Sequence, residues 1–203
     1  AASGMIPLTD TYTVEAKAPP GEITGFRLEA LPDNKGESGP GRVGSGNFVL
    51  SEFKVKIQPA GGSEFRTVSL TNATADFSQK DYAVEGAVDG KTNTGWAIAS
   101  EVKKRHVAVF ECAGPLKVAP GEKLIFTLDQ QFGNQHTIGR FRLSATATAS
   151  PLKATLTPDS VAVAWNTAPE KRTAEQKAAL ADYYRDEVDP EAKKLRKPIQ
   201  EHA

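Results

Sequence analysis

The chain has 203 residues, and its 25 Lys and Arg are balanced by 25 Asp and Glu, so the formal net charge is zero. Neutrality argues against nucleic-acid binding, which needs a surplus of basic residues to neutralise phosphates. A single Cys excludes an internal disulfide framework and a zinc site built from several cysteines. No apolar run approaches the roughly 20 residues that a helix needs to cross a bilayer. The first ten residues lack a signal-peptide pattern, and we expect the chain to be an excerpt of a longer protein.

Alternating apolar and polar residues predict β-strands through most of the chain. Apolar residues alternate with charged ones from Thr24 to Leu31, and again from Val49 to Gln58. Shorter runs of the same kind occur at 68–70, 107–109, 124–128 and 141–147. Gly- and Pro-rich turns separate these runs, and no helix-length apolar period lies between them. This pattern is typical of an antiparallel β-sandwich.

The composition changes sharply near the end of the chain. Residues 170–203 contain no Gly and no Phe, but eight acidic and eight basic residues. Thr173 and Gln176 fit a capping box that begins one helix, and Asp189 followed by Pro190 predicts the start of a second. Apolar residues recur on one face of each predicted helix (Leu180, Tyr184, Val188; Ala192, Leu195, Ile199). The sequence therefore predicts a β-sandwich over residues 1–165 and a helical tail, or the start of a following domain, over 166–203.

The segment 83–100 carries a candidate cation site. Asp89, Asn93 and Thr94 place oxygen atoms within one short loop, and calcium prefers oxygen ligands. A hairpin turn explains the same residues, and the spacing alone favours that interpretation because the alternating carboxylates of an EF-hand are missing. Trp96 follows this loop. An exposed indole ring would stack on a sugar, whereas a Trp among Ala and Ile more often belongs to a core.

Two other segments carry planar hydrogen-bonding groups. His136 and Arg140 are expected on the polar face of a strand, and His106 begins another strand. Such side chains suit sugar hydroxyls or a carboxylate, although a solvated strand face explains them equally well. The Gly-rich loop 36–47 lacks the strand–loop–helix context of a phosphate cradle. It contributes Arg42 and Asn47 at one end of the predicted sandwich, where such folds place binding residues.

Catalytic and cofactor motifs are missing from the sequence. There is no CxxCH, so this segment attaches no c-type haem, and there is no GxGxxG, GxxxxGK[ST], HExxH or GxSxG. Cys112 is best interpreted as a small buried apolar residue. A glycan-modifying enzyme would require His106, His136 and a carboxylate to converge in a cleft, which the spacing neither shows nor forbids. We therefore expect the module itself not to be an enzyme.

Several segments together resemble a module of the large planctomycete-type cytochrome c proteins, which are multidomain proteins with haem and uncharacterised domains elsewhere. The resemblance is dense from Asp10 to Ser144 and is carried by DTYTVEA, ITGFRLEALPD, GPGRVGSGNFVLSEF, ATADFSQKDYAVEGAVDGKTNTGWAI, HVAVFE and HTIGRFRLS. The tail PEKRTAEQKAALADYYRDEVDPEAKKL resembles the helical stretch that follows this module. The resemblance implies a periplasmic, cell-surface or secreted protein whose other domains are partners of this chain.

The segment AVDGKTNTGW also resembles the discoidin-like galactose-binding sandwiches, in which an Asp-Gly turn followed by Thr and Trp lies beside a structural calcium ion. This resemblance implies that Asp89 and Thr94 lie near Ca²⁺ and that Trp96 lies in the core. Glu52 and Glu111 are candidates for the distant acidic ligand that such sites often add. The resemblance further implies a jelly-roll fold and a polysaccharide or oligosaccharide ligand.

The sequence thus leads to the hypothesis of a non-catalytic carbohydrate-binding module, folded as an antiparallel jelly-roll β-sandwich with a short C-terminal helical pair. The predicted ligand-facing residues are Arg42, Asn47, Trp96, His106, His136 and Arg140, and the predicted calcium ligands are Asp89, Asn93 and Thr94. The alternative is a structural spacer or docking domain that positions the haem and catalytic domains of the parent protein. In that case, a neighbouring domain would cover the polar strand face.

Overall fold

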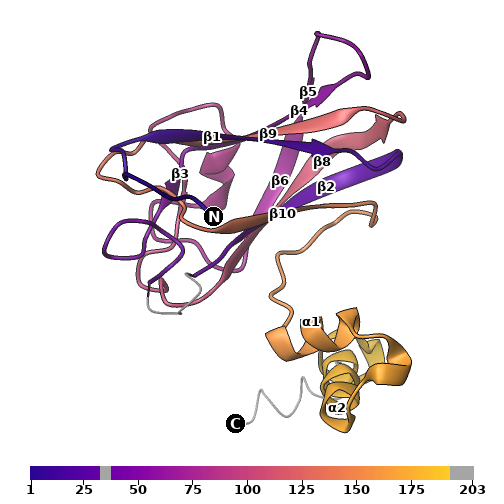
Figure 1. The fold of residues 1–203 in the computed structure, drawn as a ribbon. Coiled ribbons are helices and arrows are strands. Elements are labelled where there is room, and N and C mark those ends of the chain that lie inside the picture. Colours follow the sequence, from indigo (N-terminus) through magenta and orange to yellow (C-terminus); the bar gives the residue numbers. More distant parts are fainter. Residues whose placement is uncertain (33–37, 193–203) are drawn as a thin grey trace. The chain divides into compact units, whose positions relative to one another are not determined.

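The computed structural model describes residues 1–32 and 38–192, which belong to two compact units, Ala1–Thr155 and Leu156–Ala203. The first unit is built from antiparallel strands, and the described part of the second is helical (Figure 1). The expectation of a mainly β chain with antiparallel sheets and helices near its C-terminal end is confirmed.

The first unit contains two four-stranded sheets and one short two-stranded pair. One has the strand order β1-β9-β4-β5 and the other has the order β10-β2-β8-β6, while β3 and β7 form a short separate pair. The strands are β1 (Asp10–Lys17), β2 (Gly21–Ala30), β3 (Val49–Leu50), β4 (Glu52–Gln58), β5 (Arg66–Val68), β6 (Leu70–Ala75), β7 (Trp96–Ala97), β8 (His106–Val118), β9 (Lys123–Gln130) and β10 (Phe141–Thr146). The strand β1 was not predicted from the sequence.

The two sheets bury their apolar faces against each other. Aromatic rings from opposite sheets meet in this core: Phe53 of β4 stacks on Phe110 of β8 with ring centroids 4.4 Å apart, and Phe26 of β2 meets Phe126 of β9 edge to face. Such ring pairs stabilise a core beyond the area that they bury. All four side chains are almost completely buried, so the unit has a β-sandwich-like character.

A close approach at Gly25 fixes a chain segment on the outer face of β2 and β8. A Cβ atom at this position would clash with the side chain of Leu152 and with the backbone oxygen of Phe110. The backbone N–H of Leu152 donates to the Glu111 carboxylate at 2.6 Å, and the Leu152 side chain is buried. The segment that contains Leu152 is therefore held against the sheet by a buried apolar contact and a charge-assisted hydrogen bond.

The second unit contains the α-helices α1 (Asp159–Asn166) and α2 (Ala174–Tyr183), the 3-10 turn η2 (Pro169–Lys171) and the π-helical turn η3 (Tyr184–Val188). The predicted capping box is confirmed, because Thr173 and Gln176 exchange side-chain-to-backbone hydrogen bonds. Asp189 accepts from the backbone N–H groups of Glu191 and Ala192, as expected of an N-cap. The rest of the predicted second helix, with Leu195 and Ile199, lies outside the described residues.

Helix α1 was not predicted from the sequence, because the local pattern of its residues resembles that of a strand. Its residues 161–165, VAVAW, alternate in size as a strand would, yet they form a helix in which Val161 and Ala164 are buried. No helix within residues 1–32 and 38–192 combines the length and the apolar character that a membrane span requires.

Replacement of the two Trp residues tests this burial pattern. Trp96 is completely buried and donates from Nε1 to the Phe77 carbonyl at 2.9 Å, whereas 71% of Trp165 is exposed. We expect Trp96→Ala to lower the free energy of unfolding by about 3 to 5 kcal/mol, as measured by urea denaturation.

The matched control is Trp165→Ala, which we expect to change the free energy of unfolding of the same chain by about 0.5 kcal/mol or less. Equal losses for the two variants would contradict the burial of Trp96.

Candidate functional site

The loops around Arg42 and His136 lie side by side at one end of the first unit. Gly41 and Ile138 form an isolated antiparallel bridge, and the Arg42 backbone N–H donates to the Thr137 carbonyl at 2.8 Å. These two loops come from distant parts of the sequence, so their contact is a product of the fold. It joins the backbone next to Arg42 to the backbone next to His136, two residues that were predicted to face a ligand.

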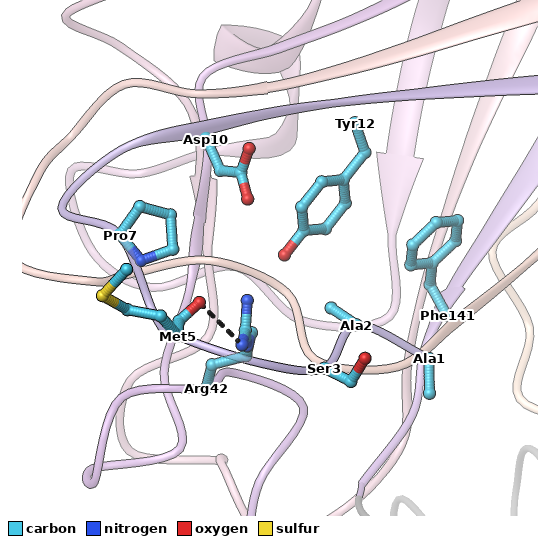
Figure 2. A pocket seen from close by; sticks show the side chains of 9 residues that line it. All are labelled: Ala1, Ala2, Ser3, Met5, Pro7, Asp10, Tyr12, Arg42 and Phe141. Carbon is cyan, nitrogen blue, oxygen red and sulfur yellow. Dashed lines mark hydrogen bonds between the residues drawn. The ribbon is translucent and has the colours of Figure 1, made fainter.

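A hollow of about 500 Å³ opens beside this contact, and we call it the Arg42 hollow (Figure 2). The Arg42 Nη2 atom donates to the carbonyl oxygens of Gly4 and Met5 at 2.9 and 3.2 Å, so the guanidinium group ties the N-terminal segment to the loop. The hollow is lined by Ala1, Ala2, Ser3, Met5, Pro7, Asp10, Tyr12, Arg42 and Phe141.

The wall of the Arg42 hollow combines apolar rings with charged groups. The rings of Tyr12 and Phe141 are stacked with centroids 6.0 Å apart and an interplanar angle of 12°, and both residues are half-buried. The Tyr12 hydroxyl donates to the Ile138 carbonyl at 2.9 Å, which fixes its ring. Asp10 and Arg42 add a carboxylate and a guanidinium group to the same wall. Sites for small polar ligands commonly combine aromatic surface with a few oriented polar groups.

Arg140 lines a second hollow that adjoins the first. This hollow measures about 350 Å³, and it shares Ala1, Ala2 and Arg42 with the Arg42 hollow. The Arg140 guanidinium contacts the Pro32 carbonyl at the long distance of 3.5 Å. Of the six predicted ligand-facing residues, the structure thus brings Arg42 and Arg140 together in the lining of this second hollow.

His136 belongs to a different surface feature, a row of three aromatic side chains that we call the aromatic patch (Tyr82, Phe132 and His136). Phe132 is 43% exposed, and its ring meets those of His136 and Tyr82 edge to face at centroid distances of 5.0 and 5.7 Å. The half-buried His136 does not line the Arg42 hollow. Tyr82 and Phe132 were not predicted from the sequence, although Phe132 lies only four residues before His136.

The expectation that Asn47 and Trp96 face a ligand is wrong. Asn47 is 7% exposed, and its side chain accepts from the Ile98 backbone N–H at 3.0 Å while donating to Gln79 at 3.2 Å. Trp96 has no exposed surface and packs edge to face on Phe48. The burial of Trp96 agrees with its alternative interpretation as a core residue. Both side chains hold the loops of this end together.

The same correction applies to His106, whose side chain has no exposed surface. Its Nδ1 atom lies 3.0 Å from the Asp76 carboxylate, and its Nε2 atom lies 2.7 Å from the Glu101 carbonyl. The Asp76 carboxylate also accepts from the backbone N–H of Val107 at 2.6 Å. His106 therefore links two loops to the start of β8, and both of its nitrogen atoms have protein partners.

The predicted cation loop gathers several oxygen atoms around one hydroxyl group. Thr94 Oγ1 lies 2.9 and 3.0 Å from the two carboxylate oxygens of Asp89, 3.1 Å from the Lys91 carbonyl and 3.4 Å from the Gly86 carbonyl. A hydroxyl group has one hydrogen to donate, so it satisfies one of these four acceptors at a time. Asn93 is exposed and takes no part in this cluster among the described residues.

Glu52 adds a second carboxylate beside this loop, as it accepts from the Gly90 backbone N–H at 2.8 Å. Burial raises the pKa of Glu52, and the nearby charge of Asp89 raises it further. Burial also acts to raise the pKa of Asp89, but hydrogen bonds from the Lys91 backbone and the Thr94 hydroxyl lower it below its ordinary value. Glu111, the other candidate for a distant acidic ligand, hydrogen-bonds to other residues: its two oxygens accept from Leu152 and Asn72.

Within residues 1–32 and 38–192, no group of three or more His, Cys, Asp or Glu side chains is placed to hold a metal ion. A cation in the Asp89 loop would therefore depend on carbonyl and hydroxyl oxygens in addition to the two carboxylates. Oxygen atoms of these kinds are the ligands that calcium takes.

Comparison with protein-family models, with curated proteins and with solved structures yields no match for this chain. Its site is therefore interpreted from its own residues and geometry.

Cys112 offers a direct test of reactivity. Burial raises the pKa of its thiol to about 11, so the thiol stays protonated at neutral pH and lacks the thiolate that reacts as a nucleophile. We expect the folded chain to react with iodoacetamide at pH 8 at least about tenfold more slowly than the urea-unfolded chain, because the ordinary thiol pKa is near 8.5. Labelling would be followed by mass spectrometry. Equal labelling rates for the folded and the unfolded chain would contradict a buried, protonated thiol.

Proposed function

We propose that this chain is a non-catalytic polysaccharide-binding module of a larger, exported multidomain protein, and that its sandwich has jelly-roll connectivity. The observation that carries the proposal is the Arg42 hollow, in which stacked rings, a guanidinium group and a carboxylate line about 500 Å³ of surface depression. Its volume falls within the roughly 300 to 1,000 Å³ typical of small-molecule sites.

The chemistry of this lining suits a sugar ring. A pyranose presents apolar C–H groups on its faces and hydroxyl groups around its edge, so it needs flat apolar contacts together with oriented polar partners. Tyr12 and Phe141 supply the apolar rings, whereas Arg42 supplies donors and Asp10 supplies acceptors. The aromatic patch adds the exposed ring of Phe132 at a loop that pairs with the Arg42 loop.

A binding role is favoured over a catalytic one by how the reactive side chains are used. His106 has partners on both ring nitrogens and no exposed surface, and burial keeps the Cys112 thiol protonated. The lining of the Arg42 hollow contains one carboxylate and no His or Cys. General acid–base catalysis by a pair of titratable groups would need a second such group beside Asp10, and the Tyr12 hydroxyl already donates to the Ile138 carbonyl.

Affinity electrophoresis through gels that contain neutral plant or algal polysaccharides tests the proposal. We expect at least one neutral polymer to retard the chain, and Arg42→Ala to weaken this binding about tenfold through the loss of charge-assisted hydrogen bonds. Phe132→Ala should weaken it too. The matched controls are Arg185→Ala in the second unit and Phe65→Ala, whose ring is 51% exposed. The controls should migrate as the unchanged chain does.

Absence of retardation across a broad panel, with the chain shown to be folded, would contradict the polysaccharide proposal and favour the spacer or docking role. One observation supports that second role: Val163 and Trp165 of α1 are 57% and 71% exposed. Large exposed apolar side chains on a small helical unit are suited to contact with another domain.

We also propose that the Asp89 loop binds a structural calcium ion. The carboxylates of Asp89 and Glu52, the Thr94 hydroxyl and the carbonyls of Gly86 and Lys91 would hold it. The proposal is supported by the surplus of acceptors around Thr94 and by the raised pKa of Glu52, since both conditions favour a nearby positive charge. The ion would join this loop to the start of β4.

Thermal unfolding with and without calcium tests this site. Because folding raises the pKa of Glu52, its ionisation opposes folding once the pH rises through that pKa, and a bound cation would remove this penalty. We expect 1 mM calcium to raise Tm at pH 7 and to raise it less near pH 5. Glu52→Gln should raise Tm without calcium and abolish the response, whereas the exposed control Glu64→Gln should retain it. A calcium-independent Tm at pH 7 would overturn the proposal.

A further inference from the structure

Three arginines surround one buried carboxylate on the outer face of the sheet with order β10-β2-β8-β6. Glu29 of β2 is 5% exposed, and its oxygens lie 3.5 Å from Arg27, from Arg105 and from Arg142. The arrangement follows from the strand register, which places Arg142 of β10 opposite Glu29. The whole chain is neutral, but Arg27 and Arg142 together carry one positive charge more than Glu29.

Glu29 uses only part of the hydrogen-bonding capacity of Arg27 and Arg142. Charge-assisted N–H···O bonds are typically about 2.7 to 2.9 Å long, so contacts of 3.5 Å are weak. A guanidinium group has five N–H donors, whereas a carboxylate has two oxygens to share among three such groups. The Arg27 and Arg142 side chains keep 28% and 61% of their surface exposed. Both therefore retain donors that face away from Glu29.

Arg27 also lines a cleft of about 400 Å³ on this face, which we call the Arg27 cleft. Val109 and Ser144, the residues opposite Arg27 on the neighbouring strands, line it from the sheet. The segment that Leu152 fastens over Gly25 forms the other wall. This wall brings the exposed Lys153, a second cation, to the cleft. The Arg27 cleft shares none of its lining residues with the Arg42 hollow.

Hydroxyl groups complete the lining of the Arg27 cleft. The Thr146 hydroxyl accepts from the Thr148 backbone N–H at 3.1 Å and donates to the Thr148 hydroxyl at 2.9 Å. The Thr148 hydroxyl thus keeps its own hydrogen for another acceptor. The Thr24 hydroxyl lies 3.1 and 2.6 Å from the carbonyl oxygens of Thr146 and Thr148, and it donates its one hydrogen to either of them in this turn. The Glu111 carboxylate on the same face of β8 is buried and occupied by Leu152 and Asn72.

We propose that the Arg27 cleft binds a carboxylate or sulfate group of an acidic polysaccharide. The choice of an anion follows from Arg27 and Lys153, the excess charge around Glu29 and the donor of Thr148. A planar guanidinium fork matches two oxygens of a carboxylate or sulfate group. That the anion belongs to a polysaccharide rests on the proposed function. The cleft is a second site, so one chain would contact such a polymer at two places.

The test compares retardation by neutral dextran, by dextran sulfate and by polygalacturonate in native gels, which separates sulfate from carboxylate as the source of the anion. We expect one of the acidic polymers to bind more tightly than dextran. Arg27→Gln combined with Lys153→Gln should weaken that binding at least about tenfold. The control is Lys56→Gln combined with Lys80→Gln, which removes the same charge from exposed positions outside the cleft.

The control variant should bind acidic polymers as the unchanged chain does, because Lys56 and Lys80 lie outside the Arg27 cleft and the two double variants have the same net charge. The proposal would be overturned if the two double variants weakened the binding of acidic polymers equally. It would also be overturned if the Arg27 and Lys153 substitutions left that binding unchanged. If the first double variant melts at a lower temperature, Lys153→Glu alone carries the test, since that side chain is exposed. A negative result for the Arg27 cleft would not affect the test of the proposed function, which depends on the binding of neutral polymers and on its weakening in Arg42→Ala.

Discussion

The alternation of buried and exposed side chains along facing strands is the constraint on which the first unit depends. Phe26 and Leu28 of β2 enter the core, so Arg27 and Glu29 must lie on the outer face. Hydrogen-bonded register then decides what stands beside them: Ser144 opposite Arg27 and Arg142 opposite Glu29. A shift by one residue would exchange the two faces and bury the charged groups. The core thus determines which residues lie on the outer face of this sheet and line the Arg27 cleft, although none of the residues that fill the core contributes a charge.

This constraint also explains how much of the fold the sequence reveals. Strands with one buried face, such as β2 and β4, show a clear period of two and were predicted from it. The edge strand β1 is only half-buried on its inner face, with Tyr12, Val14 and Ala16 alternating with polar residues, and this weaker signal was overlooked. Helix α1 was missed for a different reason, because the alternation in VAVAW resembles that of a strand and shows no helical period. Its eight residues become helical by burying Val161 and Ala164 within the second unit.

The candidate site was predictable only in its composition. Arg42 and Arg140 were selected for their planar donors, and the fold brings both to one depression. Asn47, Trp96 and His106 have equally suitable chemistry, but the loops use them internally, as links from Asn47 to Ile98, from Trp96 to Phe77 and from His106 to Asp76. Long loops that close one end of a sandwich contain many backbone polar groups that need partners. A single sequence does not reveal whether a polar side chain serves that need or a ligand. Tyr12 and Phe141 meet through contacts distant in sequence, so no local motif marks them.

The most direct test of the central claim is to map polysaccharide binding onto the chain by nuclear magnetic resonance. Amide shifts would be recorded while an oligosaccharide, taken from a neutral polymer that retards the chain, is added to the ¹⁵N-labelled protein. The account predicts saturable shifts concentrated around Asp10, Tyr12, Arg42 and Phe141, the residues that surround the Arg42 hollow. Saturable shifts confined to other surfaces, with these amides unchanged, would contradict it.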